Sequence, residues 1–163
     1  FAPFEEIKKY ESLIEGNLPY PNYEEVRRKV FSLEKRLKDL GIKRKSCHID
    51  LVPENFIESP QGRLYLIDWE YASMNDPMWD LAALFLESDF TSQEEETFLS
   101  YYESDETPVS REKIRIYKIL QDTIWSLWTV YKEEQGADFG DYGIDRYQRA
   151  VKGLVYYGGT DEK

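Results

Sequence analysis

The chain has 163 residues and a mass of 19.4 kDa, with 41% hydrophobic and 15% aromatic residues. This size and composition predict one folded domain with a sizeable core rather than a disordered segment. The formal net charge of −11 disfavours binding to nucleic acid or to an anionic membrane surface, because phosphates and acidic lipids would be repelled. The single cysteine, Cys47, excludes an intrachain disulfide and a cysteine-based zinc site.

A cytoplasmic location is the simplest interpretation, because a lone cysteine suits a reducing compartment and the sequence contains neither a signal peptide nor an apolar run of membrane length. The sequence begins with Phe1 instead of a methionine, so we expect it to be a piece of a longer chain. The sequence leaves the oligomeric state open.

Two amphipathic helices are predicted at the start of the chain. Apolar residues recur at helical spacing over residues 4–15, and Gly16 can end this helix. A second helix is predicted after Asn22, whose side chain would form a capping box with Glu25, and Gly41 would end it. The apolar stripe of the second helix comprises Val26, Val30, Leu33, Leu37 and Leu40.

A short hairpin is predicted in the middle of the chain. Strand-like runs at residues 55–58 and 63–67 flank a Ser-Pro-Gln-Gly turn. The helices predicted after this hairpin begin at Pro77, Thr91, Ser110 and residue 145. Thr91 and Glu94 would form a capping box at the start of one of them. The predicted fold class is therefore mainly α with one small β-hairpin.

Oxygen-bearing side chains concentrate around this hairpin. Asp50 and Asn55 are five residues apart at the start of its first strand, and Asp68 follows its second strand. Because a hairpin brings the start of its first strand close to the end of its second, these three side chains can converge. Two carboxylates and an amide are hard oxygen ligands of the kind that Mg²⁺ prefers.

The order of His48, Asp50, Asn55 and Asp68 matches the His-x-Asp-x-x-x-x-Asn catalytic loop of the kinases and the metal-binding Asp that follows it. Protein kinases continue with Asp-Phe-Gly and Ala-Pro-Glu, whereas this chain has Asp-Trp-Glu and then Asn-Asp-Pro-Met-Trp-Asp-Leu-Ala. Residues 44–90 resemble instead the aminoglycoside-phosphotransferase-like small-molecule kinases, and among them the bacterial choline/ethanolamine kinases.

This resemblance implies that the chain is the helical C-terminal lobe of a protein-kinase-like fold, with ATP as phosphate donor and choline as acceptor. Asp50 would accept the proton of the acceptor hydroxyl, Asn55 and Asp68 would hold Mg²⁺, and His48 and Asp80 would support the loop. The chain contains neither a Gly-rich phosphate loop nor a strand with a Val-Ala-x-Lys-like lysine. We therefore expect the N-terminal lobe that binds ATP to lie outside this chain, and the chain alone to be poorly active or inactive.

Choline is a quaternary ammonium, which is best held by aromatic faces with carboxylates nearby. Trp125 and Trp128 share a face of the predicted helix, and Tyr131 continues it. The resemblance implies a wall of the choline site here, but aromatic residues at helical spacing usually belong to a core, so both interpretations stay open. The other candidates for acceptor binding are Glu70, Tyr71, Glu87 and Phe90.

Other functions remain possible from the sequence. The same chemistry could act on ethanolamine, thiamine or an aminoglycoside, although a cage of tryptophans would favour choline over ethanolamine. A non-catalytic module that binds a cation or a partner protein is the alternative of another class. Loss of Asp50, Asn55 or Asp68 would favour that alternative, and all three residues are present.

Overall fold

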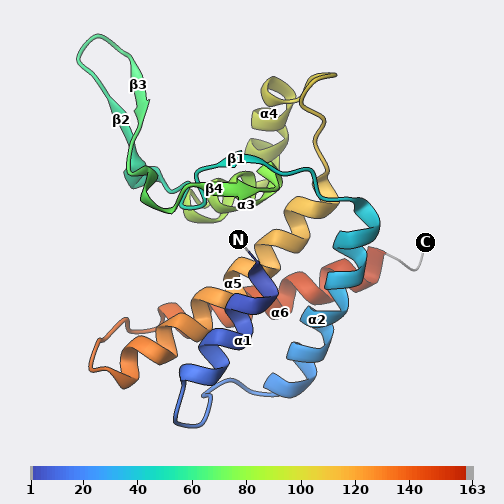
Figure 1. Cartoon of the computed structure of the whole chain (residues 1–163), viewed down its shortest axis with the longest axis vertical. Helices are drawn as coiled ribbons and strands as arrows, with labels where there is room; N and C mark the ends of the chain where they lie inside the picture. The colour runs from blue at the N-terminus through green and yellow to red at the C-terminus, as the bar shows by residue number, and fades with distance from the viewer. Residues whose placement is uncertain (1, 161–163) are drawn as a thin grey trace. The chain divides into compact units, whose positions relative to one another are not determined.

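The computed structural model describes residues 2–160, which form two compact units (Figure 1). Residues 42–114 form the loop unit, and residues 2–41 together with those from 115 onward form the helix unit. Helix α5 (Arg111–Glu134) contributes its first residues to the loop unit and the remainder to the helix unit. None of the helices in the described part of the chain is both long and apolar enough to span a membrane.

The helix unit is held together by buried tyrosines as well as by apolar side chains. The hydroxyl of Tyr20 donates to the carbonyl of Ser126 at 2.7 Å, and that of Tyr147 donates to the carbonyl of Pro21 at 2.6 Å. The rings of Tyr20 and Tyr147 stack with centroids 4.4 Å apart. The helices of this unit are α1 (Pro3–Leu13), α2 (Tyr23–Leu40), the main part of α5, and α6 (Tyr142–Thr160). The stripe predicted on α2 is buried at Val26, Val30, Leu33 and Leu37.

The ends of these helices differ from the prediction for identifiable reasons. Helix α1 ends at Leu13 because the backbone N–H groups of Glu15 and Gly16 donate to the Glu134 carboxylate, at 3.0 and 2.7 Å, instead of continuing the helix. The prediction of a capping box at Asn22 is wrong. This residue has a left-handed backbone, with φ 56°, and its side chain makes no cap hydrogen bond. Gly41 ends α2 as predicted, with φ +74°.

Helix α6 begins three residues before the predicted start, and it includes Gly143. A Cβ atom at Gly143 would lie only 2.9 Å from the Thr129 side chain and from the Tyr20 hydroxyl. This glycine therefore serves close packing inside the helix rather than a loop.

The loop unit contains two small antiparallel sheets and two helices. The predicted hairpin pairs Phe56 with Leu66, and its turn has Gly62 at φ +75°. A second sheet, which pairs Cys47 with Ser73, was not predicted, because such short and distant strands carry no local pairing signal. The elements are β1 (Lys45–Cys47), β2 (Phe56–Glu58), β3 (Leu64–Leu66), β4 (Ser73–Asn75), α3 (Pro77–Glu87) and α4 (Ser92–Tyr102).

Helix α3 forms the core of the loop unit, and nearly all of its residues from Met78 to Leu86 are buried. Asp76 caps this helix by accepting from the N–H of Met78, and it also binds Lys113 at 2.8 Å in a buried ion pair. This pair joins the first turn of α5 to the start of α3. The predicted capping box at Thr91 is confirmed at the start of α4.

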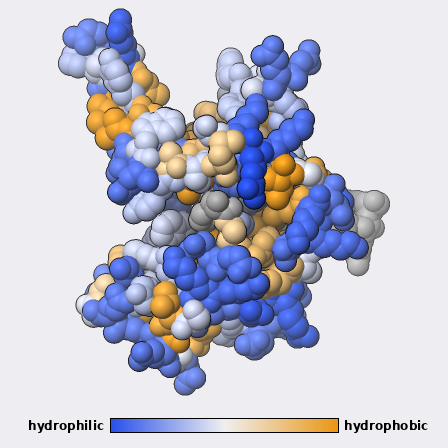
Figure 2. All heavy atoms as spheres, viewed as in Figure 1, coloured by the Kyte–Doolittle hydropathy of each residue, from blue (hydrophilic) through white to orange (hydrophobic). Residues whose placement is uncertain are grey.

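The β2–β3 hairpin extends away from α3 and the β1–β4 sheet (Figure 1). Its exposed apolar side chains include Ile57, Leu64, Tyr65 and Ile67, and Figure 2 shows hydrophobic residues below the hydrophilic tip of the hairpin.

Candidate functional site

The first part of the site is a direct contact between Asp50 and Asn55. Asn55 lies in a single turn of 3-10 helix, η1 (Pro53–Asn55), and is 7% exposed. Its Nδ2 group donates to the main-chain oxygen of Asp50 at 2.9 Å and to Asp50 Oδ2 at 3.3 Å. Both contacts use the amide nitrogen, so the amide oxygen is the group that Asn55 can offer to a cation.

Asp68 reaches the same surroundings from the other end of the hairpin. It follows β3 with a left-handed backbone, at φ 61°, and the N–H of Ile67 donates to the carbonyl of Asn55 at 2.9 Å. The pKa of Tyr71 is raised above its ordinary value chiefly by the charge of Glu70, and the charges of Asp50 and Asp68 also contribute. Asp50 and Asp68 are therefore both within electrostatic reach of one phenol group.

The Asp80 carboxylate holds the backbone at the start of the loop. Its Oδ2 accepts from the N–H of His48 at 2.7 Å, and its Oδ1 accepts from the N–H of Ile49 at 3.0 Å. Burial raises the pKa of Asp80, while these two hydrogen bonds act in the opposite direction by stabilising the charged form. Asp80 thereby ties the residues that precede Asp50 to helix α3.

His48 is 2% exposed and connects the loop to the end of the hairpin. Its Nε2 lies 2.8 Å from the carbonyl oxygen of Ile67. Because a carbonyl can only accept, Nε2 carries the proton. The ring meets Trp69 edge-on with centroids 4.8 Å apart, and Nδ1 has no hydrogen-bond partner in the described structure.

Two residues of this site were not identified from the sequence. Ile49 has φ +75°, although β-branched residues rarely adopt positive φ, and nothing in the sequence pattern signals it. Trp79, whose place in the sequence indicates only an apolar helix, donates its indole N–H to the carbonyl of Ile49 at 3.1 Å.

The predicted acceptor residues of the loop unit fall into two groups. Glu70 and Tyr71 are exposed and lie in the single turn η2 (Trp69–Tyr71), directly after Asp68. Glu87 is half-buried at the end of α3. Phe90 belongs to an aromatic cluster, where its ring centroid lies 5.5 Å from Phe85 and 6.3 Å from Phe98.

The predicted aromatic wall lies in the helix unit, on α5. Trp125 and Trp128 are both half-buried and meet edge-to-face with centroids 5.4 Å apart. The ring centroids of Trp128 and Phe139 lie 5.0 Å apart. Tyr131 is half-buried, and its ring centroid lies 6.0 Å from that of Tyr10. Their partial exposure fits a binding surface and the margin of a core equally well.

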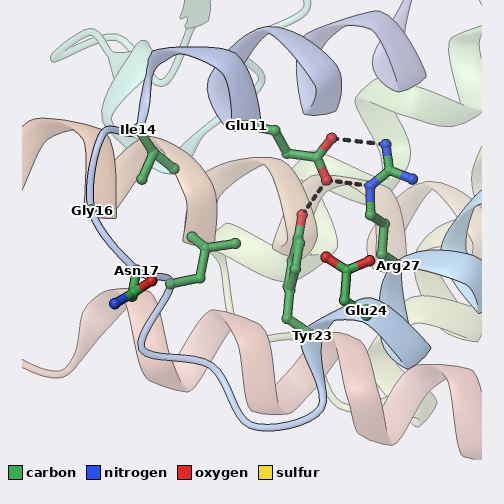
Figure 3. Close-up of a pocket in the computed structure, with 8 residues that line it drawn as sticks. Glu11, Ile14, Gly16, Asn17, Tyr23, Glu24 and Arg27 are labelled. Carbon is green, nitrogen blue, oxygen red and sulfur yellow. Dashed lines mark hydrogen bonds and ion pairs between the residues drawn. The ribbon is translucent and has the colours of Figure 1, made fainter.

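A cavity of about 460 Å³ lies between α1 and the start of α2, and none of the predicted site residues lines it (Figure 3). The Glu11 carboxylate at its wall accepts from the Tyr23 hydroxyl at 2.7 Å and from Arg27 Nε at 2.6 Å. Arg27 Nη2 makes a further bond to it at 3.0 Å. These bonds satisfy the carboxylate within the protein, so we assign it no chemistry.

Among residues 2–160, no group of three or more His, Cys, Asp and Glu side chains is arranged to hold a metal ion. The set predicted for Mg²⁺ contains two carboxylates, those of Asp50 and Asp68, and the amide of Asn55. Its donor chemistry fits a hard cation that takes its remaining ligands from phosphate and water.

Comparison with known proteins decides the family. The family model for choline/ethanolamine kinase matches residues 4–115. The chain belongs to the choline/ethanolamine kinase family. The resemblance predicted from the catalytic loop is therefore confirmed, and the loop, α3 and α4 all lie within the matched residues.

Curated relatives extend this match over most of the chain. Protein LicA of Haemophilus influenzae is 32% identical over 163 residues, which cover 93% of this chain and 47% of that protein. Protein LicA of another strain of that species is 30% identical, with 60% of its length covered. The chain thus spans about half the length of the curated relatives it matches.

Solved structures confirm the mainly helical fold as a portion of a choline kinase structure. The choline kinase LicA from Streptococcus pneumoniae is 87% identical, with a TM-score of 0.92, over 96% of this chain and 56% of that chain. A LicA structure in complex with AMP is also 87% identical, with a TM-score of 0.93 over 97% of this chain and 55% of that chain. A choline/ethanolamine kinase family protein from Mesorhizobium loti is 28% identical, with a TM-score of 0.82, over 94% of this chain and 55% of that chain.

Proposed function

We propose that this chain supplies the catalytic-loop and acceptor-binding half of a kinase that transfers the γ-phosphoryl group of ATP to the hydroxyl of choline. The observation that supports this most is the Asp50–Asn55 contact, in a loop held by Asp80, within a chain 87% identical to a solved choline kinase. A base beside a metal-ligand amide is the arrangement that phosphoryl transfer requires.

Each polar residue of the loop has a role in this proposal. Asp50 accepts the proton of the choline hydroxyl. The hydroxyl oxygen of choline forms a bond to the γ-phosphorus, and the bond from that phosphorus to the leaving ADP oxygen breaks. Asn55 and Asp68 would hold Mg²⁺, which would neutralise charge on the phosphates when bound. His48 and Asp80 keep the loop in place, because this chemistry depends on positioning more than on covalent steps.

We assign the ATP-binding clamp to the part of the relatives that this chain does not cover. The chain lacks a Gly-rich phosphate loop and a Val-Ala-x-Lys-like motif, and exposed apolar side chains such as Leu64 and Tyr65 on the hairpin suit contact with further protein. A protein of residues 1–163 alone should therefore phosphorylate choline far more slowly than an intact kinase, for which a kcat of about 1–100 s⁻¹ is typical.

The acceptor is tested by assaying the full-length protein that carries this chain with Mg²⁺ and ATP against choline, ethanolamine, thiamine and an aminoglycoside. Phosphorylated products are identified by mass spectrometry, and kcat/KM is compared across the four. We expect choline to be the best substrate. A higher kcat/KM for the aminoglycoside would overturn the choline assignment while keeping the reaction type, and phosphorylation of none of the four would overturn both.

A further inference from the structure

Ile49, which directly precedes the proposed base Asp50, has an unusual backbone. Its φ of +75° lies in the left-handed region, where a β-branched side chain crowds the main chain. Such a conformation persists only where the surrounding structure imposes it, and strain of this kind is concentrated at functional sites.

Two consecutive residues of α3 impose it. The N–H of Ile49 donates to Asp80 Oδ1 at 3.0 Å, and the carbonyl of Ile49 accepts from Trp79 Nε1 at 3.1 Å. Trp79 is 4% exposed, so its ring is held by the core of the loop unit. Rotation of the peptide between Ile49 and Asp50 would break the bond to Trp79 and turn the backbone from which the Asp50 side chain projects.

We propose that Trp79 is a positioning residue for Asp50. Its indole N–H holds the carbonyl of Ile49 and so fixes the peptide that carries the base. The inference rests on the proposed function, because it concerns the proton acceptor of that reaction. It assigns to the indole nitrogen a task that the apolar part of the ring cannot perform.

The test removes the N–H and keeps the ring. In the full-length protein, Trp79 is replaced by phenylalanine (Trp79→Phe) and, by amber suppression, by 3-benzothienylalanine, which has sulfur in place of the indole N–H. Leu81→Ala is the matched control, because Leu81 is buried in the same helix at 3% exposure.

Misplacement of a catalytic group by about 1 Å can cost about 100-fold in rate. We therefore expect kcat to fall by about tenfold to 100-fold in both Trp79 variants, with the KM values for choline and ATP within about twofold of those of the parent protein. The control should keep its kcat. If the benzothienylalanine protein is folded by circular dichroism and keeps the parent kcat, the proposal is overturned.

Amide hydrogen exchange gives a readout that does not depend on the reaction. Loss of the indole N–H should speed exchange at Ile49 and leave the buried amides of α3 protected. Unchanged protection of Ile49 in both variants would overturn the proposal even if the parent protein phosphorylated no choline. If the parent does not phosphorylate choline but the variants lose protection of Ile49, the proposed function would be overturned. The role of Trp79 in holding the backbone of Ile49 would still be supported.

Discussion

The proposed catalytic loop, residues 48–55 of the loop unit, and the Trp125–Trp128 pair of the helix unit are held in place by different interactions. The loop is fixed by side chains that bond to its backbone, with the Asp80 carboxylate on two consecutive N–H groups and the Trp79 indole on a carbonyl. The tryptophan pair is held by ring contacts, at 5.4 Å between the two rings and 5.0 Å between Trp128 and Phe139.

This difference decides what each region can tolerate. Directional hydrogen bonds specify one backbone conformation, so the loss of a single donor or acceptor alters the geometry of the site. Ring contacts depend on area and shape, so a smaller aromatic ring retains part of the interaction. Substitutions in the loop should therefore change kcat, and those in the pair should change acceptor binding or stability.

Asp50→Asn should have the largest effect. The amide cannot accept the hydroxyl proton, and a positioned general base contributes about 10²- to 10⁴-fold to rate. We expect kcat of the full-length protein to fall within that range, measured as phosphocholine formed per second. The exposed neighbour Glu54 provides the matched control, and a similar loss in Glu54→Gln would argue against a specific role for Asp50.

Trp128→Ala distinguishes the cage from the core. A desolvated cation–π contact contributes about 2 kcal/mol, which corresponds to about 30-fold in affinity. If the pair binds choline, the KM for choline should rise by that order while the KM for ATP stays constant, and Trp128→Phe should retain more affinity.

The core interpretation gives another result for the same variants. Truncation of a core tryptophan to alanine costs about 3–5 kcal/mol of stability. Thermal unfolding measured beside the kinetics separates the two interpretations, because lost stability with an unchanged KM for choline would exclude the cage.

The strain at Ile49 should appear as a difference between two small substitutions. Glycine adopts φ +75° without crowding, whereas alanine pays most of the same steric cost as isoleucine. We expect the free energy of unfolding of Ile49→Gly to exceed that of Ile49→Ala by about 1 kcal/mol. Urea unfolding of the two variants measures this difference. Equal stability, or a more stable alanine variant, would show that the folded protein does not hold a positive φ at this residue.

The smallest expected effect concerns the ionisation of Tyr71. Its pKa is raised mainly by Glu70, with smaller contributions from Asp50 and Asp68, so removing any of these charges should lower it toward about 10. NMR titration of tyrosine labelled with ¹³C at Cζ measures this shift. The decrease should be larger in Glu70→Gln than in Asp50→Asn, and no decrease in Asp68→Asn would contradict the convergence of the two ends of the hairpin.

The sequence predicts the parts of the fold and of the site that carry local signals, and it does not predict the parts that depend on tertiary packing. The helices, the hairpin and the set of Asp50, Asn55 and Asp68 carry local signals: periodicity, turn residues and spacing. The positive φ of Ile49 and its contact with Trp79 could not be predicted, because they depend on α3 packing against a loop some thirty residues earlier in the chain.

The tryptophan pair shows the opposite limit. Its spacing on one helix face was readable from the sequence, and the structure gives both rings intermediate exposure. A ring that binds a cation and a ring at the margin of a core can share this spacing and this exposure. The kinetics and thermal unfolding of the Trp128 variants distinguish them.

The central claim is that Asp50 and Asp68 act in one site, and a double-variant cycle in kcat tests it most directly. Residues that act as a unit are strongly non-additive, so the loss of one removes most of what the other contributes. For the full-length protein with ATP and choline, we expect Asp50→Asn combined with Asp68→Asn to be about as slow as the slower single variant. A double variant whose loss equals the product of the two single losses would contradict the account.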